Sequence, residues 1–325
     1  MIRGTLLAAT LLTASGLPAQ AVAQSYPAKP ITLVSPYSAG GNADLAARAL
    51  AAVAPKYLGQ PVVVVNRTGA GGIVGSQSVV DAPKDGYTML LARVGSQAVA
   101  PALDAATSYK WDSFTILTLL EVEPYICVVK GSSPYRSFLD LIAAVKANPG
   151  KISYASSGNA DASVVFPVKA FLNAGLAPNA AIKVPYKGAG DTGTAVLGGH
   201  VDFACNGMNP YVGPMKSGDL RGLVVSTRAR VAEAPDVPTA AELGMPDLEV
   251  VSGWSALYGP PGLPRDVVER WHAALAKLKE DPDWTGQVRK RGGIPSITTP
   301  EATRQYVEAQ YNAYRTLSPH FGAPK

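Results

Sequence analysis

Short β-branched runs alternate with small-residue helical patterns through the N-terminal third of the chain. The pattern predicts strands over Ile31–Ser35, Val62–Val65 and Tyr87–Ala92, with helices over Leu45–Val53 and Ile73–Val80 between them. Alternating strands and helices favour an open, mostly parallel α/β sheet with right-handed crossovers. The continuous β-branched run of Val62–Val65 is typical of a strand that is buried on both faces.

The same alternation repeats in the middle of the chain and gives way to helices near the C-terminus. It predicts strands over 125–129, 151–155, 182–185, 201–205 and 223–226, and helices over 137–147, 161–174, 192–197, 265–279, 284–291 and 301–317. Thr299 and Pro300 mark the start of the last helix, with Thr299 as N-cap and Pro300 at the first helical position. The sequence therefore predicts two α/β halves.

Length and charge narrow the classes of function. A chain of 325 residues is long enough for two ordinary domains, and 47% hydrophobic and 16% charged residues are typical of a soluble globular protein. The formal net charge of +5 is too small, and too evenly spread, to indicate nucleic-acid binding. A mild positive excess suits a receptor for anions, although a simple surplus of surface lysines would give the same total.

The first residues have the pattern of a secretory leader. Arg3 precedes the apolar stretch Leu6–Leu12, and small residues at Ala21 and Ala23 predict cleavage before Gln24. No cysteine lies near that position to carry a lipid anchor, and no later stretch has the roughly 20 apolar residues that span a bilayer. We therefore expect residues 1–23 to be a signal peptide and the mature chain to be exported.

The chain has two cysteines, Cys127 and Cys205, each within an apolar β-like run. They could pair in an oxidising compartment. The alternative is two buried free thiols that behave as small hydrophobic side chains. We expect free thiols, because a folded chain of this size does not need a covalent link.

The segment Pro36–Asp44 joins a predicted strand to a predicted helix through a glycine turn. The free N–H groups and the positive dipole end of a helix start favour an anion. Gly40 and Gly41 allow close approach of a ligand to the backbone, and Asp44 is expected to complement the helix start. Lys151–Ala160 is a second unit of this kind, so we expect two loops that share one small anionic ligand.

Local signatures of catalysis are absent from the sequence. The glycine pattern Gly188–Gly193 lacks the acidic residue that a dinucleotide site needs downstream, so it is interpreted as a ligand-facing or structural turn. No nucleophile elbow or Walker loop occurs, and His200, His272 and His320 have no metal-ligand spacing. We predict no catalytic residue, cofactor or metal, while an enzyme with a dispersed site stays open.

Several motifs together resemble the Bug family, the periplasmic substrate-binding receptors of tripartite tricarboxylate transporters. The motifs are the segments 26–31, 36–44, 58–67, 69–72, 85–91, 154–158 and 184–188, in this order along the chain. The resemblance implies a type II periplasmic-binding-protein fold with two α/β lobes around a ligand cleft. It places lobe 1 at residues 24–126 and 252–325, lobe 2 at 127–251, and the crossings near Tyr125–Val129 and Val250–Tyr258.

The resemblance also implies that two loops hold a ligand carboxylate. Carried over to this sequence, the loops give Ser38, Ala39, Gly40, Asn42 and Ala43 in lobe 1, and Ser156, Ser157, Asn159 and Ala160 in lobe 2. Further candidate ligand-binding residues are Tyr37, Arg93, Ser96, Tyr186, Asp191 and Asn206. Tyr37 and Tyr186 flank the glycine turns, where packing and a lid over the ligand are alternative roles.

Arg93 departs from the small, neutral turn that the family usually has at this point. If it faces the cleft, its planar fork could pair with a second carboxylate, which favours a dicarboxylate over a mono-acid or a zwitterion. The alternative is a surface arginine. Tyr37, Tyr186 and Tyr211 leave room for an aromatic acid such as terephthalate.

The expected function is capture of a small organic carboxylate in the periplasm, without catalysis, for uptake by membrane transporter subunits. We expect a monomer that binds no nucleic acid. Two alternatives are a secreted α/β enzyme acting on a carboxylated substrate, and a receptor that signals to a membrane protein.

Overall fold

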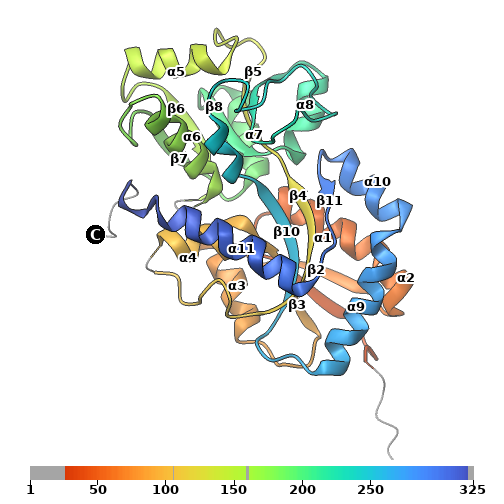
Figure 1. The fold of residues 1–325 in the computed structure, drawn as a ribbon. Helices are drawn as coiled ribbons and strands as arrows, with labels where there is room; N and C mark the ends of the chain where they lie inside the picture. Colours follow the sequence, from red (N-terminus) through yellow and green to blue (C-terminus); the bar gives the residue numbers. More distant parts are fainter. Residues whose placement is uncertain (1–25, 105, 159–160, 321–325) are drawn as a thin grey trace, which may run out of the picture.

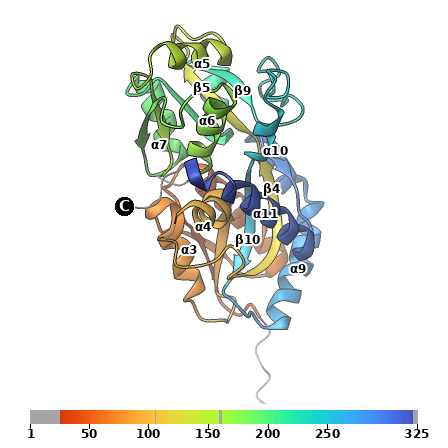
Figure 2. The ribbon, with the colours of Figure 1, turned by 60° about the vertical axis from the view of Figure 1, so that its left-hand side comes forward.

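A computed structural model describes residues 26–104, 106–158 and 161–320, which form two α/β lobes, one above the other (Figures 1 and 2). The predicted leader and two candidate ligand residues, Asn159 and Ala160, lie outside the described residues. Within the described part of the chain, no helix has the length and apolar character needed to cross a membrane.

The first lobe contains a six-stranded sheet with the strand order β11-β4-β10-β3-β1-β2. β1, β2 and β3 are parallel, whereas β10 and β4 run antiparallel to their neighbours. The strands are β1 (Ile31–Ser35), β2 (Val62–Asn66), β3 (Thr88–Arg93), β4 (Thr115–Glu123), β10 (Gly253–Gly259) and β11 (Ile294–Pro295).

The second lobe contains a five-stranded sheet with the strand order β7-β6-β8-β5-β9. Its strands are β5 (Tyr125–Lys130), β6 (Ser153–Ser156), β7 (Ile182–Pro185), β8 (Phe203–Gly207) and β9 (Leu220–Val225). β6 is parallel to β7 and β8, and β5 is antiparallel to β8 and β9.

Helices cover both sheets. In the first lobe they are α1 (Asn42–Val53), α2 (Pro55–Leu58), α3 (Ile73–Val80), α4 (Ala100–Leu103), α9 (Arg265–Lys279), α10 (Pro282–Lys290) and α11 (Pro300–Arg315), with η1 (Ala70–Gly72), η2 (Gly95–Val99) and η5 (Ser318–His320). In the second lobe they are α5 (Phe138–Ala147), α6 (Ala162–Asn173), α7 (Ala189–Gly198) and α8 (Val212–Lys216), with η3 (Asn209–Tyr211) and η4 (Pro246–Val250).

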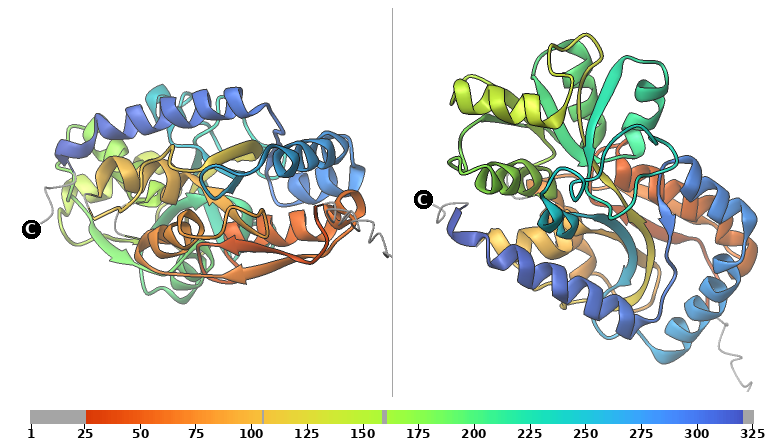
Figure 3. Two further views of the ribbon diagram at one scale, coloured as in Figure 1. Left: turned by 90° about the horizontal axis from the view of Figure 1, so that it is seen from below. Right: turned by 45° about the horizontal axis from the view of Figure 1, so that its top comes forward.

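The chain crosses between the lobes at two places. It leaves the first sheet at the end of β4 and enters the second sheet at β5, with only Pro124 between the strands. It returns between β9 and β10, after which α9, α10 and α11 pack on the first lobe (Figure 3). Both crossings lie near their predicted positions, and the exact limits of the lobes stay a prediction.

Most predicted elements are present. Thr299 caps α11, because its hydroxyl accepts a hydrogen bond from Ala302 N–H at 3.2 Å, and Pro300 takes the first helical position as predicted. The strand β4 was not predicted, and it carries two buried acids, Glu121 and Glu123.

The second strand is present where it was predicted, but the prediction that it is buried on both faces was wrong. β2 is the edge strand of the first sheet, and Val63 and Val65 are 49% and 36% exposed. A run of β-branched residues favours a strand, but it does not reveal how many neighbouring strands and helices will cover that strand.

The prediction of two free thiols was also wrong, because Cys127 and Cys205 form a disulfide. The two cysteines lie directly opposite each other on the antiparallel strands β5 and β8. Side chains at directly opposed positions lie close together, and this register is not visible in a sequence where the cysteines are 78 positions apart.

Candidate functional site

A small cavity lies between the lobes, where strands of both sheets end. Its volume is about 20 Å³, close to the 10–15 Å³ or so that one water molecule needs. The lining residues are Tyr37, Gly41, Asn42, Ala43, Arg93, Val94, Gly95, Tyr125, Ser157, Asp161, Ala189 and Asn206. The lobes also touch here, because the Tyr37 hydroxyl lies 3.4 Å from Asp161 Oδ2.

The start of α1 forms one wall of the cavity. Gly41 is its N-cap and provides no side chain, so the first N–H groups of the helix are not capped by one. Asn42 is only 5% exposed, and its Oδ1 has no hydrogen-bond partner among the described residues. This wall therefore offers backbone donors and one unused amide oxygen.

Asp44 has the structural role that the sequence predicts. Its Oδ2 accepts hydrogen bonds from Gly40 N–H and Arg48 Nε, each at 2.9 Å, and its Oδ1 accepts one from Asn66 Nδ2 at 3.0 Å. Burial raises the pKa of Asp44, but these hydrogen bonds outweigh it and hold the pKa below its usual value. Asp44 therefore fixes the turn before α1.

The start of α7 faces α1 from the other lobe. Gly188 is the N-cap of α7, again without a side-chain hydrogen bond, and Ala189 lines the cavity. A Cβ at Gly188 would lie 2.5 Å from Ser38 Oγ, and one at Gly41 would lie 3.7 Å from Ala189 N. Two uncapped helix starts therefore meet across the cavity, and glycine permits their close approach.

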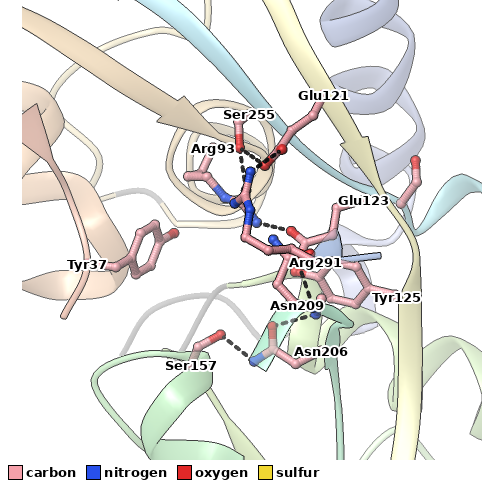
Figure 4. A network of polar contacts seen from close by, with 12 residues as sticks. Tyr37, Arg93, Glu121, Glu123, Tyr125, Ser157, Asn206, Asn209, Ser255 and Arg291 are labelled. Atoms are coloured by element: carbon pink, nitrogen blue, oxygen red, sulfur yellow. Dashed lines mark hydrogen bonds and ion pairs between the residues drawn. The ribbon is translucent and has the colours of Figure 1, made fainter. Parts of the chain in front are cut away.

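The start of α6 differs because a carboxylate caps it. Asp161 Oδ1 accepts hydrogen bonds from Ser163 N–H at 2.9 Å and from Ser157 Oγ at 2.8 Å. Asn206 Nδ2 donates in turn to Ser157 Oγ at 3.1 Å (Figure 4). These bonds fix Asp161, which is 3% exposed, at the wall of the cavity.

Arg93 lies at the end of β3 and is buried, so the surface alternative was wrong. Its Nη1 donates to Ser255 Oγ at 2.6 Å, and its Nη2 forms an ion pair with Glu123 (Figure 4). Ser255 also donates to Glu121, which pairs with Arg291 at 2.9 Å. Arg93 lines the cavity, but both terminal nitrogens of its guanidinium already have partners.

Burial and neighbouring charges shift the pKa values of Arg93, Glu123 and Tyr37. Burial alone would lower the pKa of Arg93, but the charges of Glu123 and Glu121 outweigh it and raise that pKa, so the cation persists. Burial raises the pKa of Glu123, and Arg93 opposes that rise. Burial and the charge of Asp161 raise the pKa of Tyr37 well above its usual value, so this hydroxyl keeps its proton.

The structure brings part of the predicted site together. Six candidates line the cavity: Tyr37, Asn42, Ala43, Arg93, Ser157 and Asn206. The other described candidates do not line it. Ser38 is half-buried beside the cavity, Ala39 and Gly40 are exposed, and Asp191 lies in the first turn of α7. Ser96 and Ser156 are buried, and their hydroxyls donate to Gln97 Oε1 and to Gly158 O, respectively.

Tyr186 lines a second hollow that shares Ser157 with the cavity. This hollow has a volume of about 390 Å³ and is lined by Pro36, Thr68–Gly72, Asp104, Ser157, Gly158 and Pro185–Lys187. Tyr211, in contrast, is buried in the second lobe, where its hydroxyl lies 2.7 Å from that of Thr192.

From the sequence, Gly41 was expected only as a point of close ligand approach to the backbone, and five other lining residues were not expected at the site: Val94, Gly95, Tyr125, Asp161 and Ala189. Asp161 had a local signal, because it is the first residue of a predicted helix and an acid at a helix start is a common N-cap. Glu123 had none, because the strand that carries it was not recognised. Within the described residues, no group of three or more metal-ligating side chains occurs.

Comparisons with known proteins agree with this architecture. A family model described as "Tripartite tricarboxylate transporter family receptor" matches residues 46–318. The solved periplasmic binding protein BugD is 31% identical, with a TM-score of 0.84 and coverage of 91% of this chain and 99% of BugD. MatC from Rhodopseudomonas palustris, solved with malate, is 26% identical, with a TM-score of 0.85 and coverage of 90% and 100%. Rpa4515 from R. palustris, solved with adipate, is 26% identical, with a TM-score of 0.86 and coverage of 92% and 99%.

Proposed function

Since this chain belongs to the tripartite tricarboxylate transporter receptor family, we propose that it captures a small organic carboxylate in the periplasm and delivers it to the membrane subunits of such a transporter. The family and the two-lobed fold expected from the sequence are confirmed. The family consists of substrate-binding receptors, so the enzyme alternative is set aside.

The observation that carries the proposal is the meeting of two uncapped helix starts, α1 and α7, at a buried cavity between the lobes. Backbone N–H groups and helix dipoles at such a point stabilise a carboxylate. Because the donors come from both lobes, a ligand that binds them favours the closed arrangement over an open one.

The ligand's further chemistry belongs to the same proposal. Malate in MatC and adipate in Rpa4515 support a dicarboxylate for this chain too. The predicted role of Arg93 in holding a second carboxylate would require its guanidinium to exchange Glu123 or Ser255 for the ligand. An aromatic acid stays a prediction for which Tyr37 and Tyr186 are the available rings, since Tyr211 lies elsewhere.

Two features support export to the periplasm. The N-terminal sequence has the pattern of a cleavable leader, with the predicted cut after Ala23. The disulfide between Cys127 and Cys205 is a bond that persists in oxidising compartments. We propose that the mature receptor acts there as a monomer.

The test is a thermal-shift screen of the mature protein against aliphatic and aromatic mono- and dicarboxylates, followed by calorimetry. A ligand at about 100 times its dissociation constant should add roughly 2.7 kcal/mol of stability. Recovery of an unchanged acid supports the receptor, whereas its consumption would restore the enzyme alternative. Loss of uptake of that acid on deletion of the transporter's membrane subunits tests delivery, and unchanged uptake would contradict it.

A further inference from the structure

We propose that a surface groove of the first lobe is a second ligand site, which binds a medium-chain carboxylic acid that carries a hydroxyl group at its far end. The groove has a volume of about 520 Å³, within the range of roughly 300–1,000 Å³ of small-molecule sites. It is lined by residues of β4, α9, α11 and the segment that precedes α11. All of these belong to the first lobe, so the inference is independent of the cavity between the lobes and of the proposed function.

Apolar surface predominates in this groove. Four residues of α9 line it with the spacing of one helix face, i, i+3, i+4 and i+7: His272, Leu275, Ala276 and Lys279. Leu117 and Ile297 add apolar side chains from other elements. The Thr118 hydroxyl is used within the wall, because it donates to Thr298 O at 2.7 Å and accepts from Thr298 N–H at 3.1 Å. An apolar chain therefore fits this groove better than a ligand that needs many hydrogen bonds.

One end of the α9 face is positively charged. Lys279 is exposed and forms no ion pair within the part of the chain that the structure describes. None of the lining residues is acidic. Glu280 and Glu301 are the acids next to lining residues in the sequence, but neither lines the groove. A single lysine beside an apolar wall complements a single carboxylate on an apolar chain.

The other end of the α9 face has an unsatisfied nitrogen. His272 Nε2 is buried and has no hydrogen-bond partner among the described residues. Buried polar atoms without a partner are rare, because each one costs free energy. Since the His272 ring lines the groove, a molecule bound there is the nearest source of a partner. A hydroxyl group both donates and accepts, so it satisfies this nitrogen in either tautomer of the ring.

The distance between these two ends sets the length of the ligand. His272 and Lys279 are seven residues apart on α9, or about 10 Å along a helix that rises about 1.5 Å per residue. An extended hydrocarbon chain with bonds of about 1.5 Å gains about 1.3 Å per carbon, so about eight carbons match this length. The probe is therefore 8-hydroxyoctanoate, with its carboxylate at Lys279 and its hydroxyl at His272.

The experiment compares four ligands with the mature protein by calorimetry. Octanoate lacks the hydroxyl, octane-1,8-diol lacks the carboxylate, and 6-hydroxyhexanoate lacks two methylenes. Loss of the hydroxyl or of the charge should weaken binding about threefold each. Loss of two methylenes should weaken it about tenfold, because each buried methylene is worth about fourfold. If any of the three analogues binds as tightly as 8-hydroxyoctanoate, the inference is overturned.

The variant Ala276→Trp tests the location. Ala276 is exposed and lines the groove, so an indole there occupies the space of the chain and should weaken 8-hydroxyoctanoate about tenfold. The matched control is Ala273→Trp, at an exposed position of the same helix outside the lining, which should bind as the unaltered protein does. Unchanged binding in Ala276→Trp would place the ligand elsewhere, the cavity between the lobes included, and the second site would be wrong.

Two further variants test the ends of the ligand through ratios of affinity, which a general structural effect does not change. Lys279→Gln should abolish the preference for 8-hydroxyoctanoate over the diol, whereas Lys277→Gln, which alters an exposed lysine outside the lining, should keep it. His272→Phe should abolish the preference over octanoate. Preferences that survive in both Lys279→Gln and His272→Phe would contradict the assigned ends. The ligand series with the unaltered protein decides the matter even if a variant does not fold.

Discussion

Two helices of the second lobe begin at the same cavity, but their first residues give them opposite chemistry. α7 begins after Gly188, which has no side chain to cap it, so its N–H groups are available to an anion. α6 begins after Asp161, whose carboxylate caps Ser163 N–H and brings a negative charge to the same space. A helix start therefore indicates an anion site only when its N-cap residue leaves the donors and the dipole unopposed.

The largest expected effect is the loss of stability when the disulfide in the second lobe, where α6 and α7 begin, is removed. The disulfide joins β5 to β8, directly before Asn206, which supports Ser157 and so the start of α6. A loop of 78 residues corresponds to about 4.5 kcal/mol in the chain-entropy account. Replacing both cysteines by alanine should lower the free energy of unfolding by roughly 2–4 kcal/mol, measured by denaturant titration. A loss below about 1 kcal/mol would show that the strand pair holds without the link.

The next largest effect is a loss of ligand affinity when the uncapped start of α7 is altered. Gly188→Val would place a branched side chain against Ser38, where a Cβ alone already lies 2.5 Å from Oγ. The glycine has an extended backbone, φ −179° and ψ 174°, which valine also adopts, so the lobes should still fold. We expect affinity for the ligand to fall about 100-fold, equivalent to about 2.7 kcal/mol, because the lobes can no longer meet.

The matched control is Gly213→Val in α8, where an added Cβ has nothing within 4 Å. Calorimetry should give it the affinity of the unaltered protein. If Gly188→Val binds equally well, the close approach of α1 and α7 is not needed for ligand binding.

Removing the side-chain cap of α6 should lower the stability of the protein, and not only its affinity for the ligand. Asp161→Ala removes both the cap of α6 and the acceptor for Ser157, which should cost about 1–2 kcal/mol in the free energy of unfolding. Gly188→Ala should change stability less, because α7 has no side-chain cap to lose and the added Cβ crowds only the Ser38 hydroxyl of the other lobe. Equal losses in the two variants would remove the contrast between the helix starts.

The sequence predicted most helices and strands, but it did not predict how the charged side chains pair. The strand–turn–helix units and the start of α11 were visible as local patterns, because caps and periodicity involve residues close in sequence. The contact of Arg93 with Glu123 joins two strands that are neighbours only through β10, which enters the sheet from far along the chain. The loop before α6 appeared to favour anions because its serines and glycine are neutral, while the residue that decides its charge, Asp161, follows them.

Asp281 should give the smallest effect, and it shows what a capping carboxylate does when no ligand is involved. It caps α10 as Asp161 caps α6, but both of its oxygens have strong donors. Oδ1 accepts from Asp283 N–H at 2.8 Å and Trp284 N–H at 3.2 Å, and Oδ2 accepts from Tyr57 and from Lys56 Nζ at 2.9 Å. The hydrogen bonds from Tyr57 and Lys56 are the main reason why the pKa of Asp281 lies well below its ordinary value.

The direction of the pH effect follows from that shift. Because the pKa of Asp281 is lower in the folded state, the ionised carboxylate stabilises the fold above the unfolded value of about 3.9, and this contribution is lost as the pH falls from there through the folded pKa. Asp281→Asn keeps a capping side chain but loses the charge that Lys56 and Tyr57 bind, so it should cost about 1 kcal/mol at neutral pH and make stability fall less steeply in acid. Denaturant titrations between about pH 3 and pH 7 measure both, with the exposed Asp266→Asn in α9 as the control. If the fall of stability in acid is unchanged in the variant, the donors to Asp281 lower its pKa no more than those of an exposed cap. Asp281 could then no longer serve as the fully hydrogen-bonded reference for Asp161.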